Sequence, residues 1–202
     1  MKSAIGELPA VAKANTFTKI ARERIGVLVG PEGNTKKHIE KVLSIKLQIE
    51  SETGGVTITL AENAEDPSVL FRTKDVITAI GRGFSPERAF RLIRDEEAVL
   101  NIIDLRTVFG KSESDIRRVK GRIIGMNGKT RRIIEELTDA DVVVYGHTVG
   151  MIGGIEQVEA AKEAIRMLIK GSLHSTVYRF LHRKRRELKK NMLELWEKPA
   201  EG

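Results

Sequence analysis

The sequence lacks features that several classes of protein require. None of its 202 residues is cysteine, which excludes a disulfide scaffold, a thiol nucleophile and a zinc site built on thiolates. No apolar run approaches the roughly 20 residues needed to span a bilayer. The N-terminal segment (MKSAIGELPAVAK) also lacks the apolar core of a signal peptide. We therefore expect a soluble, cytoplasmic protein with no membrane partner.

Aromatic residues are also scarce. They make up 4% of the chain, which argues against the nucleic-acid-binding folds that stack bases on aromatic side chains. The four histidines fall on separate predicted elements without ligand spacing, so we expect neither a metal site nor another cofactor. The chain is nevertheless 41% hydrophobic, which suits one large or two small domains with a substantial core.

Positive charge is in excess, and it is unevenly distributed. The formal net charge is +7. Residues 1–100 carry 15 basic and 14 acidic side chains, whereas residues 101–202 carry 20 and 14. A basic half indicates a polyanionic ligand such as RNA, DNA or a membrane surface, and a charge-rich solvated surface is the alternative.

An internal repeat gives the domain organisation. Residues 26–40 (GVLVGPEGNTKKHIE) recur 95 positions later as residues 121–135 (GRIIGMNGKTRRIIE). In each copy two apolar residues precede G-x-x-G, and a Thr, two basic residues, an Ile and a Glu follow at matched offsets. We interpret the chain as a duplicated module.

The segments around each copy follow the same order. A strand and a helix precede G-x-x-G, and a second helix follows it. Alternating apolar residues with a glycine-containing turn then predict a β-hairpin, and a longer helix ends the module. This pattern predicts an α+β fold of two β-α-α-β-β-α modules, over residues 10–95 and 98–190. The second module ends in a basic amphipathic helix.

The G-x-x-G sequence between two helices is typical of a phosphate-binding loop. Its glycines let the backbone turn tightly and let a ligand approach without meeting a Cβ atom. The start of the following helix offers backbone N–H groups and the positive end of the helix dipole. In the second copy Lys129, Arg131 and Arg132 add positive charge. We therefore expect the ligand to be a nucleic-acid backbone.

These motifs, most specifically residues 121–130 (GRIIGMNGKT), resemble the K-homology (KH) RNA-binding module of type I. In that family the G-x-x-G loop clamps the backbone of about four nucleotides, and the bases lie in an apolar groove beside it. The second copy, together with residues 177–188 (VYRFLHRKRREL), resembles a narrower family, the KH-domain ribosome-assembly factors of archaea and eukaryotes.

The resemblance to ribosome-assembly factors carries expectations about function. It implies a non-catalytic protein that binds single-stranded small-subunit ribosomal RNA near its 3′ end during ribosome biogenesis and rRNA processing. It also implies protein partners of two kinds, a ribosome-maturation endonuclease or a translation-initiation factor.

The candidate RNA site is centred on the second module and comprises its loop, its groove and its basic helix. These residues are Arg122, Ile123, Gly125, Met126, Asn127, Gly128, Lys129, Arg131, Arg132, Val142, Val144, Arg183, Lys184, Arg185 and Arg186. The first loop departs from the pattern, because Pro31 has no N–H and Glu32 places a carboxylate near the expected phosphate. We expect an auxiliary contact there, to RNA or to protein, from Gly30, Pro31, Glu32, Gly33, Lys36 and Lys37.

Nucleotide hydrolysis agrees poorly with the sequence. Residues 128–130 (GKT) resemble the end of a P-loop, but Ile123 stands where that motif requires glycine. Two other functions stay open. One is an RNA-binding subunit of an RNA-degradation complex or a translational regulator, and the other is a protein adaptor whose contact with RNA is incidental.

Overall fold

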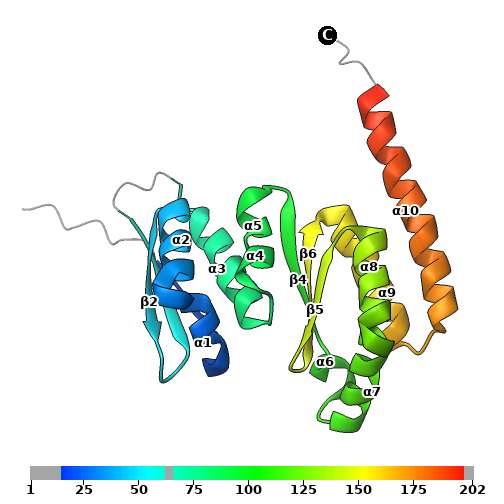
Figure 1. Ribbon diagram of the computed structural model, residues 1–202, viewed down its shortest axis with the longest axis horizontal. Coiled ribbons are helices and arrows are strands. Elements are labelled where there is room, and N and C mark those ends of the chain that lie inside the picture. Colours follow the sequence, from blue (N-terminus) through cyan, green and yellow to red (C-terminus); the bar gives the residue numbers. More distant parts are fainter. Residues whose placement is uncertain (1–14, 62–65, 198–202) are drawn as a thin grey trace, which may run out of the picture.

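The computed structural model describes residues 15–61 and 66–197, with side chains described as far as residue 190. The chain forms two α+β modules followed by a long C-terminal helix (Figure 1). The predicted start of the first module, at residues 10–14, lies outside the described residues. Among the helices described, none is long and apolar enough to cross a membrane.

The first module has the predicted order of elements. Its three strands form an antiparallel sheet in the order β1-β3-β2. Two short helices, α4 (Pro86–Ala89) and α5 (Arg91–Arg94), then lead towards the second module. The elements of the first module are β1 (Asn15–Lys19), α1 (Arg22–Val29), the 3-10 turn η1 (Pro31–Gly33), α2 (Asn34–Leu43), β2 (Ile45–Glu50), β3 (Gly55–Leu60) and α3 (Val69–Gly81).

The second module repeats this arrangement, with an antiparallel sheet in the order β4-β6-β5. The helix α10 (His174–Glu197) follows it as the predicted C-terminal helix. The elements of the second module are β4 (Ala98–Asp104), α6 (Arg106–Phe109), α7 (Glu113–Ile124), the 3-10 turn η2 (Met126–Gly128), α8 (Lys129–Thr138), β5 (Asp141–Tyr145), β6 (Thr148–Gly154) and α9 (Ile155–Ile169).

The second sheet is covered on both faces. Because neighbouring residues of a strand point to opposite faces, Val142 packs among the helices of its own module while Val143 packs against the core of the first. On β6, Met151 likewise packs in the core of the second module, and Ile152 packs in the core of the first. The outer face of the second sheet is therefore covered by α3–α5 of the first module, which lie between the two sheets (Figure 1).

Close contacts join the two modules at this face. Phe84 is fully buried, and a Cβ on Gly150 would come within 2.7 Å of its ring. Gly83 has a φ of +101°, and a Cβ there would lie 2.6 Å from the Cβ of Tyr145. The Tyr145 hydroxyl donates a hydrogen bond to Glu23, which raises the pKa of the phenol because the bond favours its protonated form. The modules are thus packed together rather than joined by a free hinge.

Replacing Phe84 by alanine should destabilise the protein by about 3–5 kcal/mol, because the change removes a buried ring and leaves a cavity between the modules. Urea unfolding followed by circular dichroism measures this free energy. Phe71→Ala is the matched control. Phe71 is 73% exposed, so its loss should change the stability by less than about 0.5 kcal/mol. Equal losses for the two variants would contradict the packing described above.

Candidate nucleic-acid interface

The second G-x-x-G loop, between α7 and α8, has a backbone conformation that requires its glycines. Gly125 and Gly128 have φ values of +72° and +75°, in the region that glycine adopts without strain. A Cβ on Gly125 would lie 2.3 Å from Oγ1 of Thr130, whereas a Cβ on Gly128 would meet nothing within 4 Å. Gly125 is therefore needed for the turn itself, and the space beside Gly128 is accessible to a ligand.

The first loop has the same conformation despite its different sequence. Gly30, Glu32 and Gly33 have φ/ψ angles of 73°/173°, 53°/21° and 76°/13°. The corresponding angles in the second loop are 72°/175°, 50°/31° and 75°/12°. In the first loop Lys37 Nζ donates to the carbonyl of Glu32 at 3.1 Å, and Arg132 makes the equivalent bond in the second loop at 2.8 Å. The first loop thus departs from the pattern in its chemistry and not in its conformation.

The glutamate that ends each repeat has the same structural role in both modules. Glu40 Oε1 accepts a hydrogen bond from the N–H of Leu47 at 2.8 Å. Glu135 Oε1 accepts one from the N–H of Val142 at 2.9 Å. Each bond links the helix after the loop to the next strand. The correspondence between the modules, at an offset of 95 residues, therefore extends from the loops to β2 and β5.

A groove of about 570 Å³ lies between α2 and β2 in the first module. Ile45 and Leu47 contribute to it but are nearly buried, and its lining includes Lys37, Lys41 and Lys46. Lysines around a groove attract the phosphates of a nucleic-acid strand. Of these lysines, sequence analysis identified Lys37 alone. Lys41 and Lys46 were not identified, because only the folded chain brings them to the groove.

A second basic hollow, of about 340 Å³, lies where α7 meets the turn between β5 and β6. Sequence analysis did not identify its cationic side chains on α6 and α7. The available signal was the spacing of Arg117 and Lys120, because residues three apart share one face of a helix. The hollow is lined by Arg106, Glu113, Ile116, Arg117, Lys120, Gly146 and His147.

Several predicted RNA contacts lie beneath the surface. Ile123 and Val142 have no exposed surface, so we reassign them from RNA contacts to core residues. Val144 is partly buried against the same core. Arg122 Nη2 donates to the carbonyl of Ser172 at 2.6 Å and so ties α7 to the segment before α10. Ile123 and Val142 therefore support the site from within the module, whereas Arg122 and Val144 keep part of their surface exposed.

The other predicted residues of the second loop lie nearer the surface. Met126, Asn127, Lys129 and Arg132 are exposed, and Arg131 is partly exposed. They surround the start of α8, where backbone N–H groups and the helix dipole favour an anion. The geometry therefore places these cations beside the expected phosphate position.

The C-terminal helix α10 packs along α8. Val177 is fully buried in the second module's core, and the Tyr178 hydroxyl lies 3.0 Å from Oγ1 of Thr130 in the first turn of α8. Farther along α10, Arg185 lines a groove together with Asp139, which follows the other end of α8. The predicted basic residues 183–186 therefore begin one to two turns beyond the loop contact and extend away from the loop.

Part of the positive charge of α10 is neutralised within the helix. Lys184 Nζ lies 2.7 Å from a Glu187 carboxylate oxygen, and Arg183 Nε lies 3.8 Å from the other. These contacts lower the pKa of Glu187, chiefly through the hydrogen bond from Lys184. The positive charge at Arg183 and Lys184 is thus partly compensated by a neighbouring carboxylate.

Two modules of this element order, each with a G-x-x-G loop between its first two helices, define a tandem type I KH protein, an RNA-binding class. Residues 99–186 match the family model of a eukaryotic-type KH domain (KH-domain type I), and residues 27–95 match the Krr1 KH1 domain. A KH domain-containing protein of Methanocaldococcus jannaschii is 46% identical over 189 residues, which cover 94% of this chain and 82% of that protein. The chain therefore belongs to the family of archaeal Dim2/PNO1-like KH-domain proteins.

Two further relatives indicate the biological context of this family. The pre-rRNA-processing protein PNO1 of Coccidioides immitis is 29% identical over 136 residues, which cover 67% of this chain and 52% of that protein. The chain thus spans about half the length of this eukaryotic relative. The crystal structure of an a/eIF2alpha-aDim2p-rRNA complex from Pyrococcus horikoshii OT3 contains a chain 48% identical to this one. The two align with a TM-score of 0.82 over 87% of this chain and 96% of that one.

Replacing Gly125 by alanine should destabilise the protein by about 1–3 kcal/mol, because its φ and ψ lie in a region that is open essentially to glycine alone. Gly121→Ala is the matched control on α7. A Cβ there meets nothing within 4 Å, so the change should stabilise the helix by about 0.5–1 kcal/mol. Urea unfolding of both variants measures the difference. If Gly125→Ala were as stable as Gly121→Ala, the loop conformation described above would be wrong.

Proposed function

We propose that this chain is a non-catalytic RNA-binding protein of ribosome biogenesis that binds single-stranded small-subunit ribosomal RNA near its 3′ end. The observation that carries the proposal is the shared conformation of two G-x-x-G loops, each at the start of a helix. Such a helix start binds phosphate through its N–H groups and its dipole. The rRNA in the complex of the Pyrococcus horikoshii relative supports rRNA as the ligand.

Both modules take part in the proposed binding, in different ways. The second loop keeps the backbone N–H groups of Met126 and Asn127, whereas Pro31 removes one from the first loop. We therefore assign the stronger phosphate clamp to the second module. The first module adds the lysine-lined groove between α2 and β2, which supports a direct contact with RNA there as well.

The relatives also support a place in ribosome maturation. A eukaryotic relative is a pre-rRNA-processing protein, and the complex of the Pyrococcus horikoshii relative contains a/eIF2alpha together with rRNA. We accordingly propose a translation-initiation factor as a protein partner. A maturation endonuclease stays a prediction from the family resemblance.

Replacing Met126 and Asn127 together by aspartate should weaken RNA binding at least about tenfold, or about 1.4 kcal/mol. Two carboxylates would repel the phosphates, while both glycines keep the loop conformation. Fluorescence anisotropy with a single-stranded RNA of the small-subunit 3′-terminal sequence, at physiological salt, measures the affinity. Pro31→Asp is the matched change in the first loop, with an expected loss of about threefold.

Circular dichroism of each loop variant verifies that it is folded. Equal losses in the two loops would contradict the ranking of the modules. If the unchanged protein bound this RNA no better than millimolar, the adaptor function would replace the proposed one.

The salt dependence of binding should report how many phosphates are held. Four phosphates clamped by one loop give a slope of log K against log salt of about −3 for a single strand, and two engaged loops give about −6. We expect the steeper slope for the unchanged protein and about −3 for the variant with aspartates at 126 and 127. A slope near zero for the unchanged protein would contradict phosphate clamping.

A further inference from the structure

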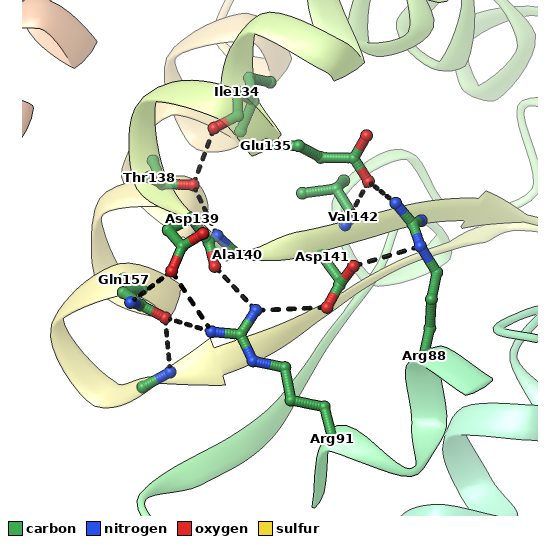
Figure 2. Close-up of polar contacts among 11 residues, drawn as sticks. Arg88, Arg91, Ile134, Glu135, Thr138, Asp139, Ala140, Asp141, Val142 and Gln157 are labelled. Atoms are coloured by element: carbon green, nitrogen blue, oxygen red, sulfur yellow. Dashed lines mark hydrogen bonds and ion pairs between the residues drawn. The ribbon is translucent and has the colours of Figure 1, made fainter. Parts of the chain in front are cut away.

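The part of the second module that corresponds to the first module's groove, beside α8 and β5, is contacted by a side chain from the first module. Glu40 and Lys46 line the groove between α2 and β2, and their counterparts 95 positions later are Glu135 and Asp141. The guanidinium of Arg88, on α4, lies between these two carboxylates (Figure 2). Its Nη2 is 2.8 Å from Glu135 Oε1, and its Nε is 3.1 Å from Asp141 Oδ1.

The contact of Arg88 is part of an extensive interface and is not an isolated surface pair. Arg91 donates to the carbonyl of Asp139 and to the Gln157 side chain, each at 2.8 Å, and lies 3.3 Å from Asp141 (Figure 2). The Glu135 and Asp141 side chains are 15% and 21% exposed, so water screens their ion pairs less than those of exposed groups. Arg88 is therefore held against α8 and β5 by partly buried ion pairs.

Arg88 keeps the capacity to bind a ligand. A guanidinium carries five N–H donors, and the two contacts with Glu135 and Asp141 use two of them. The side chain remains 38% exposed. A planar guanidinium donates to base edges in a fixed geometry and stacks on their faces.

The charges around Arg88 balance one another. Glu135 also lies 3.8 Å from Arg131 Nε, and Arg91 contacts the carboxylates of Asp139 and Asp141. Three guanidinium groups therefore face three carboxylates. Without Arg88, this cluster would carry one net negative charge, which repels phosphates, whereas Glu40 and Lys46 balance each other in the first module.

We propose that Arg88 is an RNA-binding residue of the second module, contributed by the first module, and that it contacts a nucleobase beside α8 and β5. This inference rests on the RNA-binding function proposed above. It makes the second RNA site composite, with its phosphate clamp from one module and one of its base contacts from the other.

The test compares Arg88→Met with the double variant Arg88→Met/Asp141→Asn in the full chain. The single variant loses a base contact and also leaves a carboxylate uncompensated, whereas the double variant restores the local net charge. With the same 3′-terminal RNA, we expect the single variant to bind about tenfold more weakly than the unchanged protein. The double variant should stay within about threefold of the single variant, because the contact itself is still missing.

Arg91→Met is the matched control, because it removes the same charge from the same interface without removing the guanidinium beside Glu135. Its affinity for RNA should fall about threefold, through the lost charge and interface contacts alone, and so clearly less than that of Arg88→Met. Thermal unfolding of all variants verifies that the modules stay folded. A scan of single-base substitutions in the RNA should identify one position whose base preference is lost in Arg88→Met and kept in Arg91→Met.

Two results would overturn the role of Arg88. Recovery of the original affinity in the double variant would show that Arg88 acts only by neutralising carboxylates. Equal losses in Arg88→Met and Arg91→Met would show that the interface matters and the contact does not. Failure of the RNA-binding function itself is distinguishable, because the unchanged protein would then bind this RNA no better than millimolar.

Discussion

The packing of the first module's helices on the outer face of the second sheet is the contact on which the arrangement of the RNA-binding surfaces depends. Val143 and Ile152 make that face apolar, and burying apolar surface contributes about 25 cal/mol per Å². Apolar packing alone would allow small shifts between the modules at little cost in free energy. Charge-assisted hydrogen bonds are directional, so Arg88 and Arg91 select one arrangement among the packings that the apolar surfaces allow.

A fixed arrangement of modules has a consequence for RNA binding. When two binding surfaces are held together, occupation of one raises the effective concentration of the ligand at the other. If the modules were joined only by a flexible linker, RNA binding would have to order them, at a cost in conformational entropy. The shared core and the contact between Tyr145 and Glu23 instead order the modules when the protein folds. Two modest sites can therefore combine into a strong one.

The repeat predicted the fold more completely than it predicted the site. Glycine positions, helix order and the hairpin follow from local patterns, and the two loops agree because both keep their two glycines and the threonine, Thr35 or Thr130, that lies against the first glycine. The interface was missed, because Arg88 lies outside the repeat and its partner Glu135 is 47 residues away. One signal was available: the run Val142–Val144 is typical of a strand buried on both faces. The same burial explains why Val142 belongs to the core and not to the RNA surface.

The uneven charge of the two halves of the sequence does not correspond to the local charge of the two modules in the folded protein. The second half carries the excess of basic residues, yet the surface beside α8 and β5 carries the carboxylates of Glu135 and Asp141. Arginines from the nearly neutral first half pair with them. On α10, Lys184 and Arg183 pair with Glu187. Net charge per half therefore does not measure how strongly each module attracts RNA, because the groups that set the local potential cross the module boundary. The potential that an RNA strand would meet is therefore a property of the pair of modules.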